Sequence, residues 1–76
     1  MLFIIHTKDH DPAHVHVYFG TPKDHEARAR VQLQNVEIID SDAFTGSDLK
    51  KIEDRCEKRK EEFLTEWRRI NRKKLQ

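Results

Sequence analysis

Apolar and polar residues alternate along the first half of the chain with the period of two that is typical of β-strands. Between residues 14 and 19, apolar side chains fall on one side of the pattern, and His14, His16 and Tyr18 fall on the other. The clearest alternation spans residues 26–34, whose apolar side consists of Ala27, Ala29, Val31 and Leu33. Together with two shorter apolar runs, the pattern predicts strands over about residues 2–6, 14–19, 26–34 and 36–40.

The spacing of apolar residues changes after Asp40 to three and four, which is typical of an amphipathic helix. The apolar stripe consists of Leu49, Ile52, Cys56, Phe63, Leu64, Trp67 and Ile70. It predicts one long helix over about residues 47–73, capped by Thr45 or Ser47. Arg59 and Lys60 interrupt the stripe, so the helix either bends there or lays one of these long side chains across the core.

The apolar faces of the strands and of the helix are buried most simply by packing against each other. A chain of 76 residues leaves room for one core, so we expect a single domain over residues 1–76. The predicted fold class is α+β, with an antiparallel three- to four-stranded meander packed against one long C-terminal helix. The face of the sheet that carries His14 and His16 is then exposed or covered by a partner.

A loop of hairpin length joins the second and third strands and sets their register. The register that we expect places His16 opposite Arg28 and His14 opposite Arg30. Because a positive neighbour disfavours the charged form of imidazole, we expect both histidines to be neutral at pH 7. Neutral imidazole is the form that accepts a proton or binds a metal ion.

The composition excludes several classes of protein. Apolar residues make up 36% of the chain and charged residues 38%, yet the net charge is only +1. This balance argues against a disordered polyelectrolyte and against a nucleic-acid binder that is basic throughout. The single cysteine, Cys56, excludes an internal disulfide framework and fits a reducing cytosol. Because no apolar run is long enough to span a membrane, we expect a cytoplasmic protein without a membrane partner.

Charge is unevenly distributed along the chain. Residues 1–48 carry eight acids and four bases, a net charge of −4, whereas residues 49–76 carry eleven bases and six acids, a net charge of +5. The cations at the end of the helix include Arg68, Arg69, Arg72 and Lys73. They complement the negative end of the helix dipole, and they also offer a contact for nucleic acid.

The densest chemistry lies in residues 9–16, which contain three of the five histidines. His14 and His16 point to the same side of a strand, with Cα atoms about 6.5 Å apart, so both imidazoles can reach one divalent metal ion such as zinc. His10 or Asp9 would supply a third ligand. Two other interpretations remain open: the histidines stabilise the turn and fill the sheet face, or they act without metal as an acid–base pair or anion site.

Other candidate residues have simpler structural explanations. Cys56 and Trp67 lie on the apolar stripe, so we expect a core thiol rather than a nucleophile, and a packing anchor. The sequence contains no glycine-rich phosphate loop, no Ser/His/Asp arrangement and no nucleic-acid-binding signature with stacking aromatic residues.

Residues 9–18, Asp-His-Asp-Pro-Ala-His-Val-His-Val-Tyr, resemble the hallmark of domain-of-unknown-function family 4160 (DUF4160), roughly Asp-His-x-Pro-Pro-His-Phe-His-Val. The strand over 27–33 and the Glu-Glu-Phe-Leu-Thr-Glu-Trp segment ending at Trp67 are also similar to the family pattern. Ala13 replaces the second proline and Val15 replaces the phenylalanine, and a stretch that often precedes the first strand is absent, which suggests a shortened N-terminus. The resemblance singles out His10, Pro12, His14 and His16.

The resemblance implies a small bacterial protein that works with a partner, because members of the family resemble components of toxin–antitoxin-like gene pairs. Our first hypothesis is therefore a protein-interaction module that uses the sheet face and the helix as binding surfaces. The alternative is a histidine-dependent hydrolase or nuclease, with His14 and His16 as metal ligands or acid–base pair and Arg28 or Arg30 holding phosphate. A third hypothesis is a homodimer that pairs through an exposed sheet edge.

Overall fold

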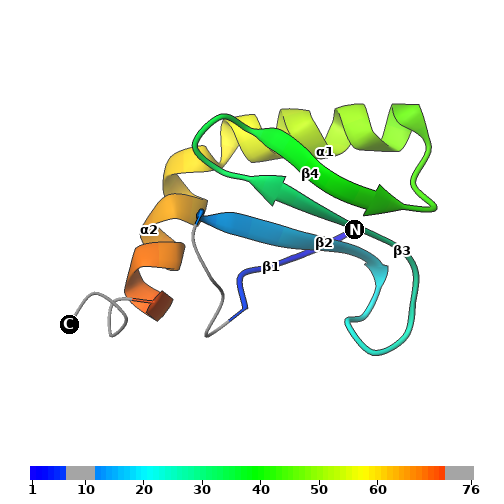
Figure 1. Cartoon of the computed structure of the whole chain (residues 1–76), viewed down its shortest axis with the longest axis horizontal. Helices are drawn as coiled ribbons and strands as arrows, with labels where there is room; N and C mark the ends of the chain where they lie inside the picture. The colour runs from blue at the N-terminus through cyan, green and yellow to red at the C-terminus, as the bar shows by residue number, and fades with distance from the viewer. Residues whose placement is uncertain (7–11, 72–76) are drawn as a thin grey trace.

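A computed structural model of the chain describes residues 1–6 and 12–71. Four strands are followed by two helices: β1 (Leu2–Ile4), β2 (His14–Gly20), β3 (His25–Gln32), β4 (Glu37–Asp42), α1 (Gly46–Lys58) and α2 (Lys60–Asn71). Each strand pairs antiparallel with the next, so the sheet is a simple meander in the order β1-β2-β3-β4 (Figure 1). The predicted α+β class is confirmed, with four strands.

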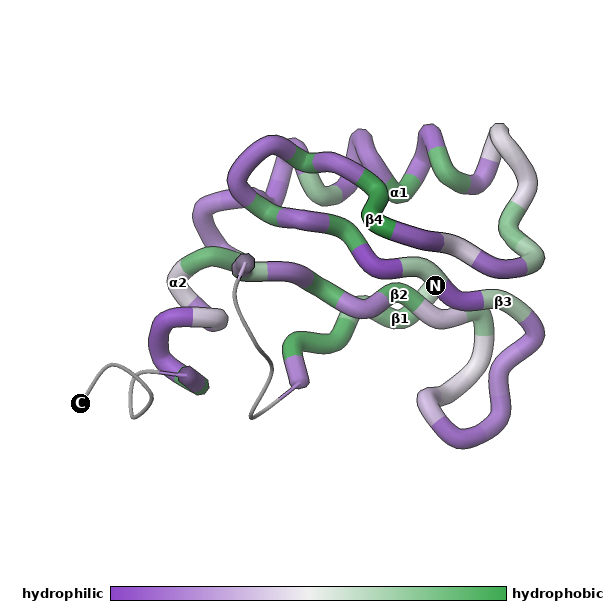
Figure 2. The backbone as a smooth tube through the Cα atoms, viewed as in Figure 1, coloured by the Kyte–Doolittle hydropathy of each residue, from purple (hydrophilic) through white to green (hydrophobic). Residues whose placement is uncertain are grey.

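The apolar sides of the strands and helices form one core. Val15, Val17, Val31, Leu33, Ile52 and Cys56 are completely buried or nearly so. Figure 2 shows the underlying alternation of hydrophobic and hydrophilic residues along β2 and β3. Cys56 is 0% exposed and Trp67 is 6% exposed, so both lie in the core as predicted. No helix within the described part of the chain is both long and apolar enough to cross a bilayer.

The predicted helix bends at Arg59, which is one of the two alternatives that the interrupted stripe left open, and the bend divides it into two helices. Arg59 has φ −109° and ψ 18°, outside the helical range. Hydrogen bonding continues around it, since its N–H donates to the Arg55 carbonyl at 3.0 Å and its carbonyl accepts from the Phe63 N–H at 2.9 Å. The Arg59 guanidinium lies 4.7 Å from the centre of the Phe63 ring, and Lys60 Nζ donates to the Gln34 carbonyl at 2.5 Å.

The bend has a geometric reason. A straight helix over the predicted range would be about 40 Å long, whereas the longest strand, of eight residues, extends about 26 Å. The far end of a straight helix would therefore pass beyond the sheet and expose its apolar side chains. After the bend, the Phe63 ring stacks on Phe3 of β1 at 5.8 Å between centroids, and the Trp67 ring lies 5.2 Å from that of His14.

The start of α1 follows one of the two predicted caps. Thr45 is the N-cap: its hydroxyl accepts a hydrogen bond from the Asp48 N–H at 3.1 Å. The Asp48 carboxylate in turn accepts from the Thr45 N–H at 3.2 Å, which completes a capping box. These reciprocal bonds fix where the helix begins and how it enters over the sheet.

The predicted register between β2 and β3 is wrong by two residues. His16 lies opposite Arg30, Tyr18 opposite Arg28, and His14 opposite Gln32. The ladder is irregular after Phe19, because Gly20 has φ +121° and already pairs with His25. A shift of two residues preserves the face on which each side chain lies, so the histidines and arginines still share one face, as expected.

A second irregularity changes the outer face of β4. Arg30 pairs with Asp40 but Val31 pairs with Ile38, which leaves Ile39 as an extra, 45% exposed residue in a β-bulge. Because of the bulge, Asp40 rather than Ile39 lies opposite Arg30. The bulge therefore brings a carboxylate onto the face that carries the histidines.

Candidate functional site

Four histidines and one tyrosine gather on the sheet face opposite the core. We call His6, His14, His16, Tyr18 and His25 the imidazole row. Ring centroids lie 5.0 Å apart between His14 and His16 and 4.2 Å apart between His6 and His16. Tyr18 continues the row. Its ring stacks on that of His16 with centroids 6.3 Å apart, and it is tilted against the ring of His25 with centroids 5.1 Å apart. The predicted pair of His14 and His16 is therefore part of a larger group.

The expectation that this face is openly exposed is wrong for part of the row. His14 is only 7% exposed and Tyr18 only 8%. His14 is covered because the bend in the helices brings Trp67 against its ring. His6 lies over the neighbouring part of the row, and a hydrogen bond of 3.0 Å joins its Nε2 to the Tyr18 hydroxyl. Only the parts of the row beyond these contacts remain accessible to a partner or substrate.

The backbone defines the tautomer of His14. Its Nδ1 lies 2.8 Å from the Pro12 carbonyl oxygen, which can only accept, so the proton of the neutral ring is on Nδ1. The lone pair is then on Nε2. A backbone carbonyl that holds the other ring nitrogen in this way is a common second contact of metal-binding and of proton-accepting histidines.

His6 and His25 are functional candidates that the sequence patterns missed. His6 follows β1 and continues the outward positions Leu2 and Ile4, which pair with Tyr18 and His16. Extending the period of two from β1 by one step would have indicated it. His25 is held by an Nδ1 contact of 3.1 Å to the Thr21 carbonyl oxygen, and its place beside Tyr18 depends on the irregular loop.

A charged cluster lies beside the row. Arg30, opposite His16, donates to Asp40 Oδ2 through Nε at 3.0 Å and through Nη2 at 2.5 Å. Arg28 Nη1 lies 3.6 Å from Asp40 Oδ1. The hydrogen bond from Arg30, with the positive charges of Arg30, Arg28 and His16, lowers the pKa of Asp40 below its ordinary value. The sequence patterns missed Asp40, because the bulge that turns it to this face follows from pairing with β3.

The three predicted catalytic residues do not all meet. His14 and His16 are in ring contact, but Arg28 lies opposite Tyr18, one row further along the sheet, and Arg30 lies beside His16. Asp40 balances much of the positive charge that we expected to surround the histidines. The arrangement therefore offers an imidazole pair next to a carboxylate-bound arginine, which suits proton transfer better than capture of a highly charged anion.

The predicted metal site falls partly outside the described residues, since His10 and Asp9 belong to residues 7–11. Within residues 1–6 and 12–71, no three histidine, cysteine, aspartate or glutamate side chains form an arrangement that fits a metal ion. His14 and His16 by themselves supply two nitrogen ligands, fewer than zinc sites take from protein. A metal bound by His10, His14 and His16 thus stays a prediction from the sequence.

The other residues considered in the sequence analysis, Cys56 and the cations at the end of the helix, are not part of the imidazole row. Burial raises the pKa of the Cys56 thiol to about 11, so the group is protonated at neutral pH. Arg69 is paired with Glu66 within α2, and Arg68 is exposed on the same helix. Arg72 and Lys73 lie outside the described residues, so the predicted nucleic-acid contact stays a prediction.

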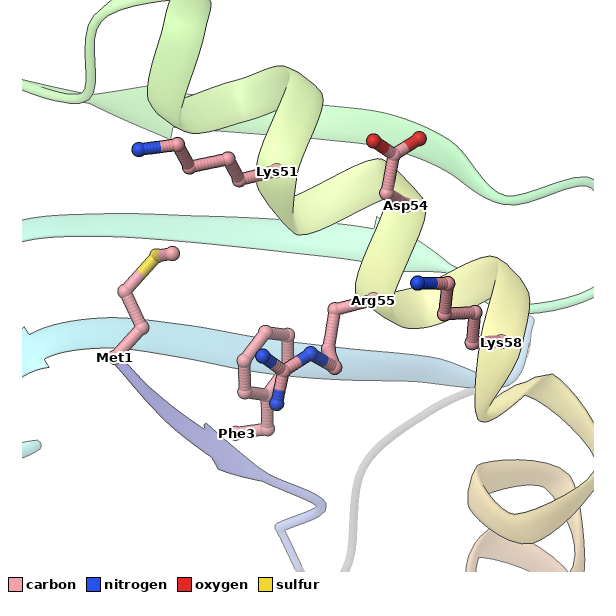
Figure 3. A pocket seen from close by; sticks show the side chains of 6 residues that line it. All are labelled: Met1, Phe3, Lys51, Asp54, Arg55 and Lys58. Carbon is pink, nitrogen blue, oxygen red and sulfur yellow. The ribbon is translucent and has the colours of Figure 1, made fainter.

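A second candidate surface lies on the core side of the sheet, beside β1. It consists of three adjoining pockets. Those of about 320 and 400 Å³ lie between β1 and the two helices, and the one of about 520 Å³ lies where Phe19 of β2 and the start of β3 meet the loop before α1. We call this surface the β1 groove; Met1, Phe3, Phe19, Lys51, Arg55 and Lys58 are among its lining residues. Figure 3 shows its middle part, where Met1 and Phe3 come from the strand and the charged side chains come from α1.

The groove combines an apolar base with a charged rim. Met1 is 53% exposed and Phe19 is 52% exposed, among the most exposed large apolar side chains in the described chain. Lys51, Arg55 and Lys58 stand over the middle pocket, where Asp54 is the single acid among the lining residues. An accessible apolar strip with charges along one side is a common feature of protein-binding surfaces.

The comparisons with known proteins identify a family and no individual relative. No curated protein and no solved structure matches the chain significantly. The family model described as "Domain of unknown function (DUF4160)" matches residues 1–68. That span includes the whole sheet, the imidazole row, α1 and most of α2. The chain therefore belongs to the DUF4160 family, as its histidine motif indicated.

Proposed function

We propose that this protein is a protein-interaction module, and that it forms one half of a toxin–antitoxin-like pair. The observation that carries the proposal is the β1 groove, an apolar strip that residues 1–6 and 12–71 leave accessible. Met1 and Phe19 both expose about half of their surface there, next to the partly buried Phe44. Burying an exposed phenylalanine side chain contributes about 1.5–3 kcal/mol, so a partner that covers this strip gains substantially.

The paired nature of the proposed function rests on family resemblance. Members of the DUF4160 family resemble proteins that are encoded beside a second small protein. A chain this short also has a small core and limited stability, and burial against a partner adds to both. The partner that the resemblance implies is the product of a small gene encoded beside the gene for this chain.

The test is co-expression of the tagged full chain with the product of the adjacent small gene. We expect a complex of defined stoichiometry by size-exclusion chromatography with light scattering, and growth arrest by one protein that the other relieves. Phe19→Asp should weaken the complex at least about tenfold, because it places a charge on the apolar strip. Ile39→Asp is the matched control, since Ile39 is similarly exposed but lies on β4.

Two results would contradict the proposal. One is the absence of both a complex and a growth effect under conditions in which both proteins are folded. The other is a complex that Phe19→Asp and Ile39→Asp affect equally, because the groove would then have no special part in binding.

A second candidate function, histidine-dependent phosphodiester hydrolysis, is favoured by the contact between His14 and His16. In this candidate, one neutral imidazole takes a proton from the attacking water while the other, protonated, gives one to the leaving oxygen. Arg28 or Arg30 would hold the phosphate. A divalent metal on His10, His14 and His16 would instead supply activated water.

Hydrolysis of a short RNA and of bis(p-nitrophenyl) phosphate by the untagged protein tests this candidate. We expect His16→Gln to lower turnover by at least about 100-fold, and Lys50→Gln, at an exposed position of α1 outside the row, to change it little. Elemental analysis of the same preparation tests the metal, with about one equivalent expected if it is resident. No turnover above a buffer blank, or turnover that survives His16→Gln, would exclude the candidate.

A further inference from the structure

We infer that the β1 groove binds an extended, acidic segment of the partner protein, which pairs with β1 as a fifth strand. This inference rests on the proposed function, and it names the chemistry of the segment that the partner would present. Three observations carry it: the uncharged edge of β1, the groove directly beside that edge, and the cations on the rim of the middle pocket.

The edge of β1 is short, only three residues, but it lacks the side chains that normally protect sheet edges. Within the described residues β1 pairs with β2 on one side only, because it is the first strand in the sheet order. Edge strands usually carry charged residues, proline or a bulge that prevent further pairing. Residues 1–5 are Met-Leu-Phe-Ile-Ile and contain none of these residues, and Leu2 is 40% exposed. Such an edge offers its backbone N–H and C=O groups to another strand.

The groove lies where the side chains of an added strand would project. A strand paired with β1 runs about 4.8 Å from it, and its alternate side chains point to the two faces of the sheet. Those on the core side enter the groove beside Phe3, below α1. Those on the other side lie next to the outward positions Leu2 and Ile4, where apolar side chains fit best.

The rim cations of the middle pocket select acidic side chains there. Glu26 and Asp48 line the pocket at one end of the groove and Glu62 and Glu66 line the pocket at the other, so the acidic residues of the bound segment belong at its middle. Lys51, Arg55 and Lys58 lie on one side of α1 and line the middle pocket, and Figure 3 shows Arg55 reaching down toward Phe3. In the part of the chain that the structure describes, none of these three cations forms an ion pair. Carboxylates that project into the groove would pair with them at a site that excludes some water, where such contacts are stronger than in open solvent.

A second copy of the chain is a poorer occupant than an acidic partner. Pairing two β1 edges around a two-fold axis would bring two sets of the same cations toward one junction. The edge segment, residues 1–6, contains no acidic residue that could offset this repulsion. The charges therefore favour a different protein chain, whose strand alternates acidic and apolar residues.

The experiment is a selection from a displayed library of random octapeptides against the full chain. We expect the selected peptides to carry acidic residues at their middle, where they meet the three cations, and apolar residues at alternate positions. Their affinity, measured by fluorescence anisotropy, should fall at least tenfold in Lys51→Glu/Arg55→Glu/Lys58→Glu. Lys50→Glu is the control, because it makes the same kind of charge change on an exposed position of α1 outside the groove lining. If the triple variant does not fold, glutamine at the same three positions replaces it.

Methylating the peptide backbone nitrogens along one edge should also abolish binding, because strand pairing needs those N–H groups. Failure to enrich peptides, enrichment of basic peptides, unchanged affinity in the charge variants, or concentration-dependent dimerisation through β1 would overturn the inference. The complex with the adjacent gene product is measured in parallel. If it forms equally well with the triple variant, the proposed function stands and only the strand-addition inference falls.

Discussion

Burial removes the reactivity of the only thiol in the chain. Cys56 is completely buried between α1 and the sheet, and desolvation raises its pKa to about 11. We expect no reaction with a maleimide or with Ellman's reagent in the native protein at neutral pH, and complete reaction in urea, because only unfolding exposes the thiolate-forming group. Rapid labelling of the folded protein would contradict the core assignment.

Gly20 is required by its backbone conformation and by its surroundings. It has φ +121°, and a Cβ added there would lie 2.5 Å from the Asp24 carbonyl oxygen. Gly20→Ala should therefore lower the free energy of unfolding by about 1–3 kcal/mol, measured by urea denaturation. Gly46→Ala is the control: a Cβ at Gly46 meets no atom within 4 Å, so we expect little change or a slight stabilisation. Equal effects of both substitutions would show that the strain at Gly20 is unimportant.

The pairing of β3 with β4 connects stability to pH through Asp40. Its pKa is lowered in the folded protein, chiefly by the hydrogen bond from Arg30, so the ionised carboxylate stabilises the fold. This contribution is fully present above the ordinary pKa of 3.8 and is lost as the pH falls through the lower folded value. Because both partners are 39% exposed, solvent screening keeps the contribution below about 1 kcal/mol.

Asp40→Asn should thus lower the free energy of unfolding at pH 7 by a few tenths to about 1 kcal/mol. The difference from the unmodified protein should shrink as the pH falls below 3.8 and through the lower folded pKa, because protonation of Asp40 removes the ion pair. Asp42→Asn, on the same strand but without an ion pair in the described structure, serves as the control. A difference that persists unchanged at low pH would mean that the ion pair does not cause it.

The bend at Arg59 determines which part of the core each helix covers. Before it, α1 covers the core with Ile52 and Cys56; after it, α2 closes the end of the sheet with Phe63 and Trp67. Periodicity placed these residues on one stripe, and all four are buried. Only the length of the sheet, which the stripe does not contain, shows why one straight helix would not keep them covered.

Trp67 joins two segments that lie far apart in the sequence. Its ring lies in the core and against His14 at the start of β2, so Trp67→Ala should remove about 3–5 kcal/mol of stability. Since small domains have about 5–15 kcal/mol in total, the variant should be largely or partly unfolded at 37 °C by circular dichroism. Arg68→Ala, at the neighbouring exposed position, should change stability by less than about 0.5 kcal/mol. A Trp67→Ala protein with near-normal stability would contradict this role.

Local sequence patterns were sufficient to predict which face of each strand and helix points to the core. The alternation in β2 and β3 assigned Val15, Val17, Ala29 and Val31 to the core, because the side-chain period of a strand depends only on its own backbone. The Thr45 cap and the burial of Cys56 follow from short-range spacing in the same way. The histidine motif was also sufficient to indicate the DUF4160 family.

The neighbours of each side chain across the sheet could be known only from the folded chain. The register that pairs His16 with Arg30 follows from the irregular backbone at Gly20, and the carboxylate of Asp40 joins the site through a bulge in β4. His6 reaches the imidazole row from a different strand, and Trp67 covers His14 from a helix more than fifty residues away. A periodic pattern records which way a side chain points, but its neighbours across the sheet are set by loop geometry and by contacts between distant segments.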